Sequence, residues 1–211
     1  MTYRYNFNPS IYFIADPSVC GGRAIEDVVR SAVAGGVTCV QFRNKSGNLE
    51  QIEAQARSLQ EILAESAIPF IINDYAELAA KIGADGVHIG QGDVSAVQAR
   101  KIIGESAILG VTAFTKEHYS MIDAQIIDYV GTGPCYPTLT KPDKAVIGIE
   151  GFAELAKDSP VCVVGIGGIT AQNAPNVIKA GASGVAMMRS ISLADDPEIA
   201  ARAFLTTEII T

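Results

Sequence analysis

The chain has 211 residues, of which 48% are hydrophobic and 18% are charged, and its formal net charge is −7. This length and apolar content suffice for one sizeable core, and no apolar run reaches transmembrane length. The negative charge, with no basic run and no Trp, argues against nucleic acid as a partner. The start of the chain lacks a signal-peptide pattern, so we expect a cytoplasmic protein with no membrane partner.

Short apolar runs alternate with helical stretches along the whole chain. Most of these runs are continuous in Val and Ile, which is typical of strands buried on both faces of a parallel sheet. In chain order, we predict strands at residues 10–16, 39–43, 69–74, 86–90, 108–113, 128–133, 161–167 and 184–188.

The segments between these runs are rich in helix formers. The clearest are residues 48–66 and 95–105, which place apolar residues at spacings of three and four. Three segments end in glycine before the next strand, in "AVAGGVTCV", "AAKIGADGVHI" and "IKAGASGVAM". Eight strand–helix cycles predict an α/β fold, a single-domain (β/α)8 TIM barrel over residues 1–211. Many doubly wound sheets have a GxGxxG motif after the first strand, and this sequence has none there.

In such barrels, the chemistry lies at the carboxyl ends of the strands. The predicted strand ends carry polar or charged residues, whereas the strand interiors are apolar. This asymmetry is hard to explain by stability alone and marks the rim as a candidate site. The polar residues at these ends include Gln41, Arg43, Lys45, Asn73, Asp74, Gln91, Asp93 and Thr112.

Two acidic residues, Asp74 and Asp93, follow consecutive predicted strands, so their carboxylates should converge on the rim. Two carboxylates without His or Cys suit a hard cation, and Mg²⁺ prefers one or two carboxylates together with substrate phosphates. Each Asp alone could instead cap the helix that follows its strand. The presence of both beside a basic cluster favours a metal site.

Basic residues are expected on the same rim, at Arg43, Lys45 and Lys141. Together with a divalent ion they would suit a pyrophosphate group, because Arg can bind two of its oxygens at once. The alternative is a solvated surface charge, which fits Lys144 better than Arg43. The glycines of "GIGGIT" and the segment after the last strand predict a second anion site, a phosphate cup of backbone N–H groups.

Other reactive side chains favour supporting roles. His88, within "GVHIG", is expected in the barrel interior or behind the site rather than as a catalyst. Cys135 has no identifiable base, which argues against a nucleophile. The four cysteines lie far apart without a CxxC pair, so we expect reduced structural thiols.

Five motifs, "QFRNK", "IINDYAELA", "GADGVHIGQGD", "DYVGTGPCYPTLTK" and "GIGGIT", stand in the order and spacing of one family. The chain resembles the thiamine phosphate synthases (thiamine-phosphate pyrophosphorylases) from "YFIAD" to "GVAMM". The resemblance implies a Mg²⁺-assisted transferase of thiamine biosynthesis. Such an enzyme joins 4-amino-5-hydroxymethyl-2-methylpyrimidine diphosphate to a thiazole phosphate, or its carboxylated form, and releases pyrophosphate by a dissociative displacement.

The resemblance also implies roles for individual residues. Asp74 and Asp93 would hold Mg²⁺. The residues implied to contact the pyrimidine diphosphate are Gln41, Arg43, Asn44, Lys45, Asn73, Thr112 and Lys141, of which Arg43, Lys45, Thr112 and Lys141 would be catalytic. The residues implied at the thiazole phosphate are Thr138, Thr140, Gly168, Met188 and Arg189.

Three positions depart from the pattern of this family. Thr112 stands where Ser is usual, which keeps the hydroxyl. Tyr75 replaces a charged residue after "ND", and Arg189 replaces a Ser beside the expected thiazole phosphate. Two alternatives therefore stay open: a thiazole tautomerase on the same barrel, and a non-catalytic sensor of thiazole or thiamine phosphate. The sequence leaves the oligomeric state open, a homo-oligomer included.

Overall fold

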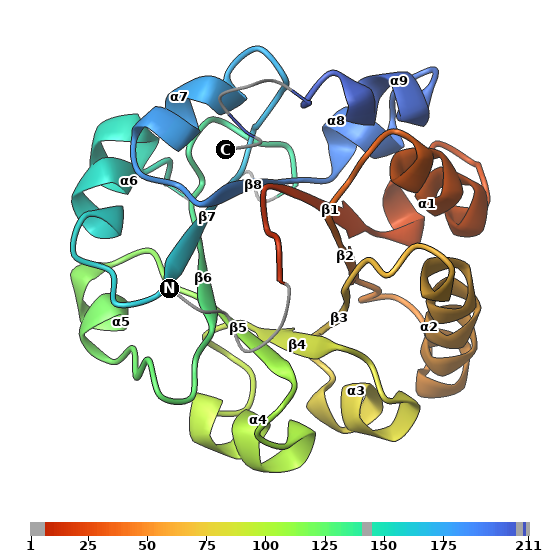
Figure 1. Cartoon of the computed structure of the whole chain (residues 1–211), viewed down its shortest axis with the longest axis horizontal. Coiled ribbons are helices and arrows are strands. Elements are labelled where there is room, and N and C mark those ends of the chain that lie inside the picture. The colour runs from red at the N-terminus through yellow and green to blue at the C-terminus, as the bar shows by residue number, and fades with distance from the viewer. Residues whose placement is uncertain (1–6, 141–144, 206–208, 210–211) are drawn as a thin grey trace.

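A computed structural model describes residues 7–140, 145–205 and 209 of the chain. Within these residues, eight parallel strands pair in sequence order, and β8 pairs with β1 to close a barrel (Figure 1). The predicted fold class is confirmed. The strands are β1 (Ile11–Ala15), β2 (Cys39–Phe42), β3 (Phe70–Asn73), β4 (Gly86–Ile89), β5 (Ile108–Thr112), β6 (Tyr129–Thr132), β7 (Cys162–Ile166) and β8 (Gly184–Met187).

Helices form a ring outside the strands (Figure 1). They are η1 (Pro17–Val19), α1 (Ile25–Ala34), α2 (Leu49–Ala64), α3 (Ala76–Ile82), α4 (Ala96–Ile103), α5 (Lys116–Ser120), α6 (Gly148–Ala156), α7 (Ala174–Lys179), α8 (Arg189–Ser192) and α9 (Pro197–Arg202). The two clearest helix predictions correspond to α2 and α4. Capping boxes fix both starts, through Asn48 with Gln51 in α2 and Ser95 with Gln98 in α4. None of the helices in the described part of the chain combines the length and apolar character that a membrane span requires.

The continuous apolar strands serve two separate cores. Along β1, Tyr12 and Ile14 join a cluster inside the barrel, whereas Ile11 and Phe13 join the larger cluster between the strands and the helices. Successive side chains of a strand point to opposite faces, so a strand that is buried on both faces needs apolar residues at every position. This explains why the strands do not alternate in sequence.

The amino end of the barrel is filled by residues 7–10, which directly precede β1. Phe7 is 2% exposed, and the centre of its ring lies 5.0 Å from that of Tyr129 inside the barrel. The backbone at Pro9 runs so close to Gly184 that a Cβ there would lie 1.9 Å from the Pro9 carbonyl oxygen. The amino end is therefore packed, which leaves the carboxyl end for a site.

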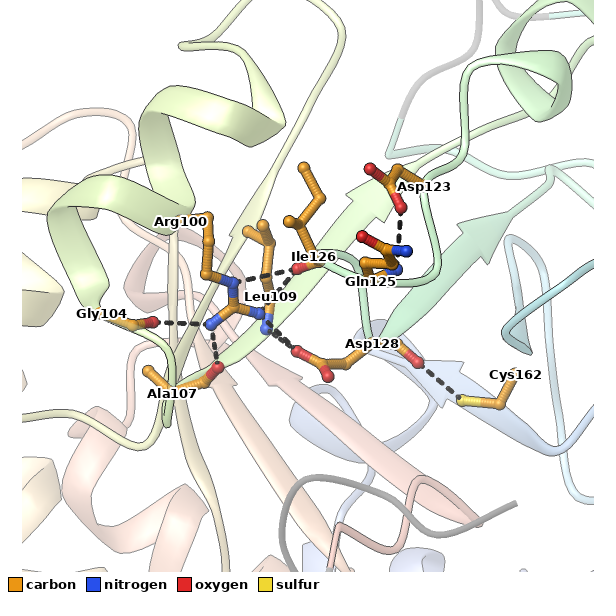
Figure 2. Close-up of polar contacts among 9 residues, drawn as sticks. All are labelled: Arg100, Gly104, Ala107, Leu109, Asp123, Gln125, Ile126, Asp128 and Cys162. Atoms are coloured by element: carbon orange, nitrogen blue, oxygen red, sulfur yellow. Dashed lines mark hydrogen bonds and ion pairs between the residues drawn. The ribbon is translucent and has the colours of Figure 1, made fainter.

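A buried ion pair joins α4 to the segment before β6 (Figure 2). The Arg100 side chain is 3% exposed and lies 2.8 Å from the Asp128 carboxylate. Its guanidinium also donates to the carbonyl oxygens of Gly104, Ala107 and Ile126. Asp128 in turn accepts from the N–H of Leu109 in β5, at 2.8 Å. One side chain thus satisfies the carbonyls of two loops at the amino end of the barrel.

Replacement of this arginine should destabilise the protein strongly. Arg100→Met would leave Asp128 without its counter-charge and three carbonyls without a donor, so we expect a loss of about 3 kcal/mol or more in the free energy of unfolding. Urea denaturation measures this loss. Arg30→Met is the matched control, since Arg30 is 59% exposed in its pair with Asp27 and should have a much smaller effect. Equal losses in the two variants would contradict the structural role of Arg100.

Candidate active site

A cavity of about 430 Å³ lies at the carboxyl end of the barrel. Its walls come from strand ends and from the loops that follow them, and its floor includes side chains of the barrel interior. Most of the residues predicted from the sequence are found together here. Those that line the cavity are Gln41, Arg43, Lys45, Asn73, Asp74, Gln91, Asp93, Thr112, Thr138, Thr140 and Met188.

The two acidic residues meet on one side of this cavity. Asp74 follows β3 and has a left-handed backbone with φ 69°, an uncommon conformation for a residue other than glycine. Its N–H donates to the His88 carbonyl oxygen of β4 at 2.8 Å, which holds this conformation in place. The Asp93 carboxylate accepts from the Gly90 N–H at 2.7 Å. Asp93 therefore closes its own loop and leaves the helix that follows to be capped by Ser95.

The Asp93 carboxyl feels the charge of its neighbour Asp74. Desolvation by the cavity walls raises the pKa of Asp93, and the adjacent Asp74 carboxyl raises it further. The Gly90 N–H and the Lys45 ammonium act in the opposite direction. Lys45 lies 2.7 Å from the Asp74 carboxylate, while more than half of its side chain is exposed. Two carboxylates that repel each other beside a cation are a suitable environment for a divalent metal.

Arg43 is held by an acidic residue that sequence reasoning did not single out. Asp16 directly follows β1, is 1% exposed, and pairs with the Arg43 guanidinium. Asp16 also accepts from the Ser18 N–H at 2.9 Å and from the Ser18 hydroxyl at 2.5 Å. The sequence does carry a signal for Asp16. It is the acidic residue at the end of "YFIAD" and so stands at a strand end, as Asp74 does.

Asn44 has a different environment from the other predicted contacts. Its amide nitrogen donates to Gln55 at 2.8 Å, and its amide oxygen accepts from the N–H groups of Ser46 and Gly47. It is absent from the described lining of the cavity. The Asn44 side chain thus shapes the loop that carries Lys45, and its contact with the pyrimidine diphosphate stays a prediction.

The loops after β6 and β7 form the other side of the cavity, and they are hydrogen-bonded to each other. The N–H of Cys135 donates to the Ile166 carbonyl at 2.9 Å, and the N–H of Tyr136 donates to the Gly167 carbonyl at 3.0 Å. Glycines allow this approach, because a Cβ on Gly133 would lie 2.0 Å from the Ile166 oxygen. The peptide bond between Gly133 and Pro134 is cis.

The residues predicted for the thiazole phosphate are only partly in the cavity lining. Gly168 has φ 63° and faces the Pro137 backbone, while its neighbour Gly167 lines the cavity. Arg189 begins α8, is half-buried, and is missing from the lining found among the described residues. Lys141 lies outside the described residues, so its predicted position is not tested.

The remaining reactive side chains have the supporting environments expected of them. His88 is half-buried and bonds through Nε2 to the Thr112 hydroxyl at 3.0 Å. All four cysteines are free and buried. Burial raises the pKa of the Cys135 thiol to about 12, so it stays protonated at neutral pH and is a poor nucleophile.

Barrel and cavity together define a (β/α)8-barrel enzyme with charged groups gathered at the carboxyl ends of its strands. The family model described as thiamine monophosphate synthase matches residues 11–191. A thiamine-phosphate synthase of Bacillus velezensis is 46% identical over 200 residues, which cover 92% of this chain and 88% of that protein. A thiamine-phosphate synthase of Azorhizobium caulinodans is 41% identical, with 95% of each chain covered.

Solved structures agree with these sequence relationships. A thiamine phosphate pyrophosphorylase from Pyrococcus furiosus superposes with a TM-score of 0.87 at 27% identity, covering 97% of this chain and 98% of that one. An orotidine 5′-phosphate decarboxylase from Pyrococcus horikoshii, at 15% identity and a TM-score of 0.67, shares the fold alone. The chain belongs to the thiamine monophosphate synthase family. The predicted function, a thiamine-phosphate synthase, and the predicted enzyme class, a transferase, are confirmed.

The close contact between the two loops makes Gly133 a sensitive position. Gly133→Ala should force the loops apart, destabilise the protein by about 2 kcal/mol and weaken binding of the thiazole phosphate. Gly151→Ala is the control, because its Cβ would lie 3.5 Å from Ile147 and the change favours the helix α6. Thermal unfolding and substrate titration measure the two effects. Unchanged stability and binding in Gly133→Ala would show that the two loops do not need a glycine at this contact.

Proposed function

We propose that this cavity condenses the pyrimidine diphosphate with the thiazole phosphate, or its carboxylated form, to give thiamine monophosphate and pyrophosphate. One observation carries the proposal: a carboxylate pair with a lysine lies across the same 430 Å³ cavity from hydroxyl-bearing, glycine-rich loops. Two anionic substrates can therefore meet between two different anion-binding walls. The cytoplasmic location and the absence of nucleic-acid and membrane partners remain predictions, as does the oligomeric state.

The pyrimidine diphosphate would occupy the side formed by the first strands. Gln41 and Asn73 are 4% and 8% exposed, and both line the cavity, as expected of residues that bind a flat heterocycle. Lys45 is close enough to Asp74 to neutralise part of the charge that gathers there. Arg43 is pre-oriented by Asp16, which restricts its guanidinium before a ligand binds and so lowers the entropy cost of binding.

Mg²⁺ fits the carboxylate pair. The Asp74 carboxyl is close enough to Asp93 to raise the pKa of Asp93, and a divalent cation would relieve the repulsion between the two. Among the described residues no group of three His, Cys, Asp or Glu side chains could hold a metal. Diphosphate oxygens and water would supply the other ligands, the arrangement that Mg²⁺ prefers. Bound there, the ion would stabilise the negative charge of departing pyrophosphate.

The thiazole phosphate would occupy the side formed by the last strands. Thr138 and Thr140 line the cavity and would offer hydroxyls to this phosphate, and the N–H of Thr140 donates to the Thr138 hydroxyl at 3.2 Å. The backbone at Gly167 and Gly168, which has positive φ at both positions, would bring N–H groups near the phosphate. Met188, which lines the cavity, would supply an apolar contact for the thiazole ring, and Arg189, the next residue, would add a charge.

The reaction then requires orientation and charge stabilisation rather than a protein nucleophile. The bond between the pyrimidine methylene carbon and the diphosphate oxygen breaks, and the aminopyrimidine stabilises the cation that remains. The lone pair of the thiazole nitrogen forms the new carbon–nitrogen bond. The chain must hold the two rings in line, exclude water, and donate hydrogen bonds to the leaving group from Arg43, Lys45, Thr112 and Lys141.

An assay of pyrophosphate release tests the proposal. Purified protein is mixed with Mg²⁺ and both substrates, and each component is omitted in turn. Release that needs both substrates and the metal is expected. Binding of the thiazole phosphate without release would instead indicate a sensor, and isomerisation of the thiazole alone would indicate a tautomerase.

The metal site is tested by Asp93→Asn. The amide keeps the shape but removes one carboxylate charge, so turnover should fall about 100-fold or more and half-saturation should need more Mg²⁺. Asp158→Asn, a change at an exposed position after α6, is the control and should keep the wild-type rate. A wild-type Mg²⁺ dependence in Asp93→Asn would exclude this residue as a ligand.

The predicted role of Lys141 has a control in the same segment. Lys141→Ala should lower kcat by about 100-fold because the leaving group loses a cation, while the unfolding transition stays in place. Lys144→Ala, expected from the sequence to remove only a solvated charge, should leave kcat unchanged. Steady-state kinetics of both variants measure this difference. Equal kcat values in the two would show that Lys141 does not act on the leaving group.

A further inference from the structure

Five polar side chains form one hydrogen-bonded chain across the floor of the cavity. Gln41 Nε2 lies 2.9 Å from the Tyr12 hydroxyl, which lies 2.6 Å from the Tyr129 hydroxyl. Tyr129 is 3.0 Å from His88 Nδ1, and His88 Nε2 is 3.0 Å from the Thr112 hydroxyl. The chain therefore begins and ends at residues predicted to contact the pyrimidine diphosphate.

The barrel interior is packed around this hydrogen-bonded chain of side chains. Tyr12 of β1 and Tyr129 of β6 are each 1% exposed, and their ring centres are 5.8 Å apart. A Cβ on Gly110 would lie 2.1 Å from the Tyr129 ring, and a Cβ on Gly131 would lie 3.2 Å from the His88 ring. Glycines on β5 and β6 thus make room for these rings. Rigid packing of this kind fixes which atoms face each other.

The protons in this chain can be counted. Burial raises the pKa of both Tyr12 and Tyr129 well above the ordinary value, so each phenol keeps its single proton at neutral pH. Gln41 Nε2 is only a donor, so it donates to the Tyr12 oxygen. Tyr12 then donates to Tyr129, and Tyr129 donates to His88 Nδ1. In a neutral imidazole the His88 proton then lies on Nε2 and is donated to the Thr112 oxygen.

The opposite direction is less favourable. If His88 carried its proton on Nδ1, Tyr129 would accept from it and donate to Tyr12, which already accepts from Gln41. The Tyr12 proton would then turn from both partners of this chain toward the Cys39 thiol, and sulfur is a weak acceptor. A poorly satisfied donor in a buried site is costly, so the first direction prevails.

We propose that His88 is a positioning residue whose Nε2–H tautomer, set by Tyr129, turns the Thr112 hydroxyl hydrogen into the cavity as a donor to the leaving diphosphate. At the other end of this hydrogen-bonded chain, the side-chain amide oxygen of Gln41 stays available as an acceptor. His88 lines the floor of the cavity, and in this role it acts through its hydrogen bond to Thr112. This role rests on the proposed function, because it assigns the diphosphate to the Thr112 side of the cavity.

A spectroscopic measurement on the wild-type chain tests the tautomer. In protein labelled with ¹⁵N at histidine, long-range ¹H–¹⁵N correlations at neutral pH without substrate distinguish a protonated from an unprotonated ring nitrogen. The chain has two histidines, so His118→Gln assigns the spectrum. We expect a protonated Nε2 and an unprotonated Nδ1 at His88. A proton on Nδ1, alone or together with Nε2, overturns the proposal.

Matched variants test the positioning role. In His88→Gln the amide nitrogen can replace Nε2 and still donate to Thr112, whereas in His88→Asn the amide reaches only the Tyr129 side. We expect His88→Asn to lower kcat about 10- to 100-fold with little change in the KM for the thiazole phosphate. His88→Gln should restore most of this loss, which a purely structural role would not predict.

A double-mutant cycle completes the test. In the Thr112→Val background, which has no hydroxyl to orient, His88→Asn should cause no further loss in kcat. Additive losses overturn the positioning role. Failure of the wild-type protein to release pyrophosphate would overturn the proposed function and this role with it. A wild-type rate with the wrong tautomer or with additive losses would overturn the role of His88 alone.

Discussion

Parallel pairing of β8 with β1 is the constraint on which the site depends. Because this pairing closes the sheet, the carboxyl ends of all the strands surround one opening. Asp74 and Asp93 therefore approach from neighbouring strands, and the loop with Thr138 reaches the same cavity from the other side. Each strand contributes only one or two side chains, and the closed sheet fixes their relative positions. Parts of the chain that are distant in sequence become one cavity without any long insertion.

Much of this arrangement could be predicted because its signals are local. Continuous Val and Ile runs mark the strands, and polar residues directly after them mark the rim. The convergence of Asp74 and Asp93 then follows from the order of parallel strands alone. The glycine that ends α3 was equally predictable. Gly83 has a left-handed backbone with φ 68°, and this conformation favours glycine whatever the neighbouring residues are.

The parts that could not be predicted depend on which side chains face the barrel interior and on which strand ends lie next to each other. Tyr12 and Tyr129 lie within apolar runs, and nothing in those runs says which side chains face inward. The role of Asp16 depends on Arg43, which comes from another strand end, and the sequence does not show which strand-end charges pair with each other. Arg100 reads as an ordinary helix surface residue, although it is buried against two loops. In each case the decisive contact joins residues far apart in sequence.

The backbone hydrogen bonds between the loops after β6 and β7 have a consequence for how this barrel diverges. Because Cys135 and Tyr136 are hydrogen-bonded to Ile166 and Gly167, the start of one loop is fixed against the start of the other. A chimera that takes only one of them from a relative would combine backbones that were selected separately. Successful exchange of substrate range would then require both loops to be transplanted as a matched pair, so in evolutionary terms they form a single inherited unit.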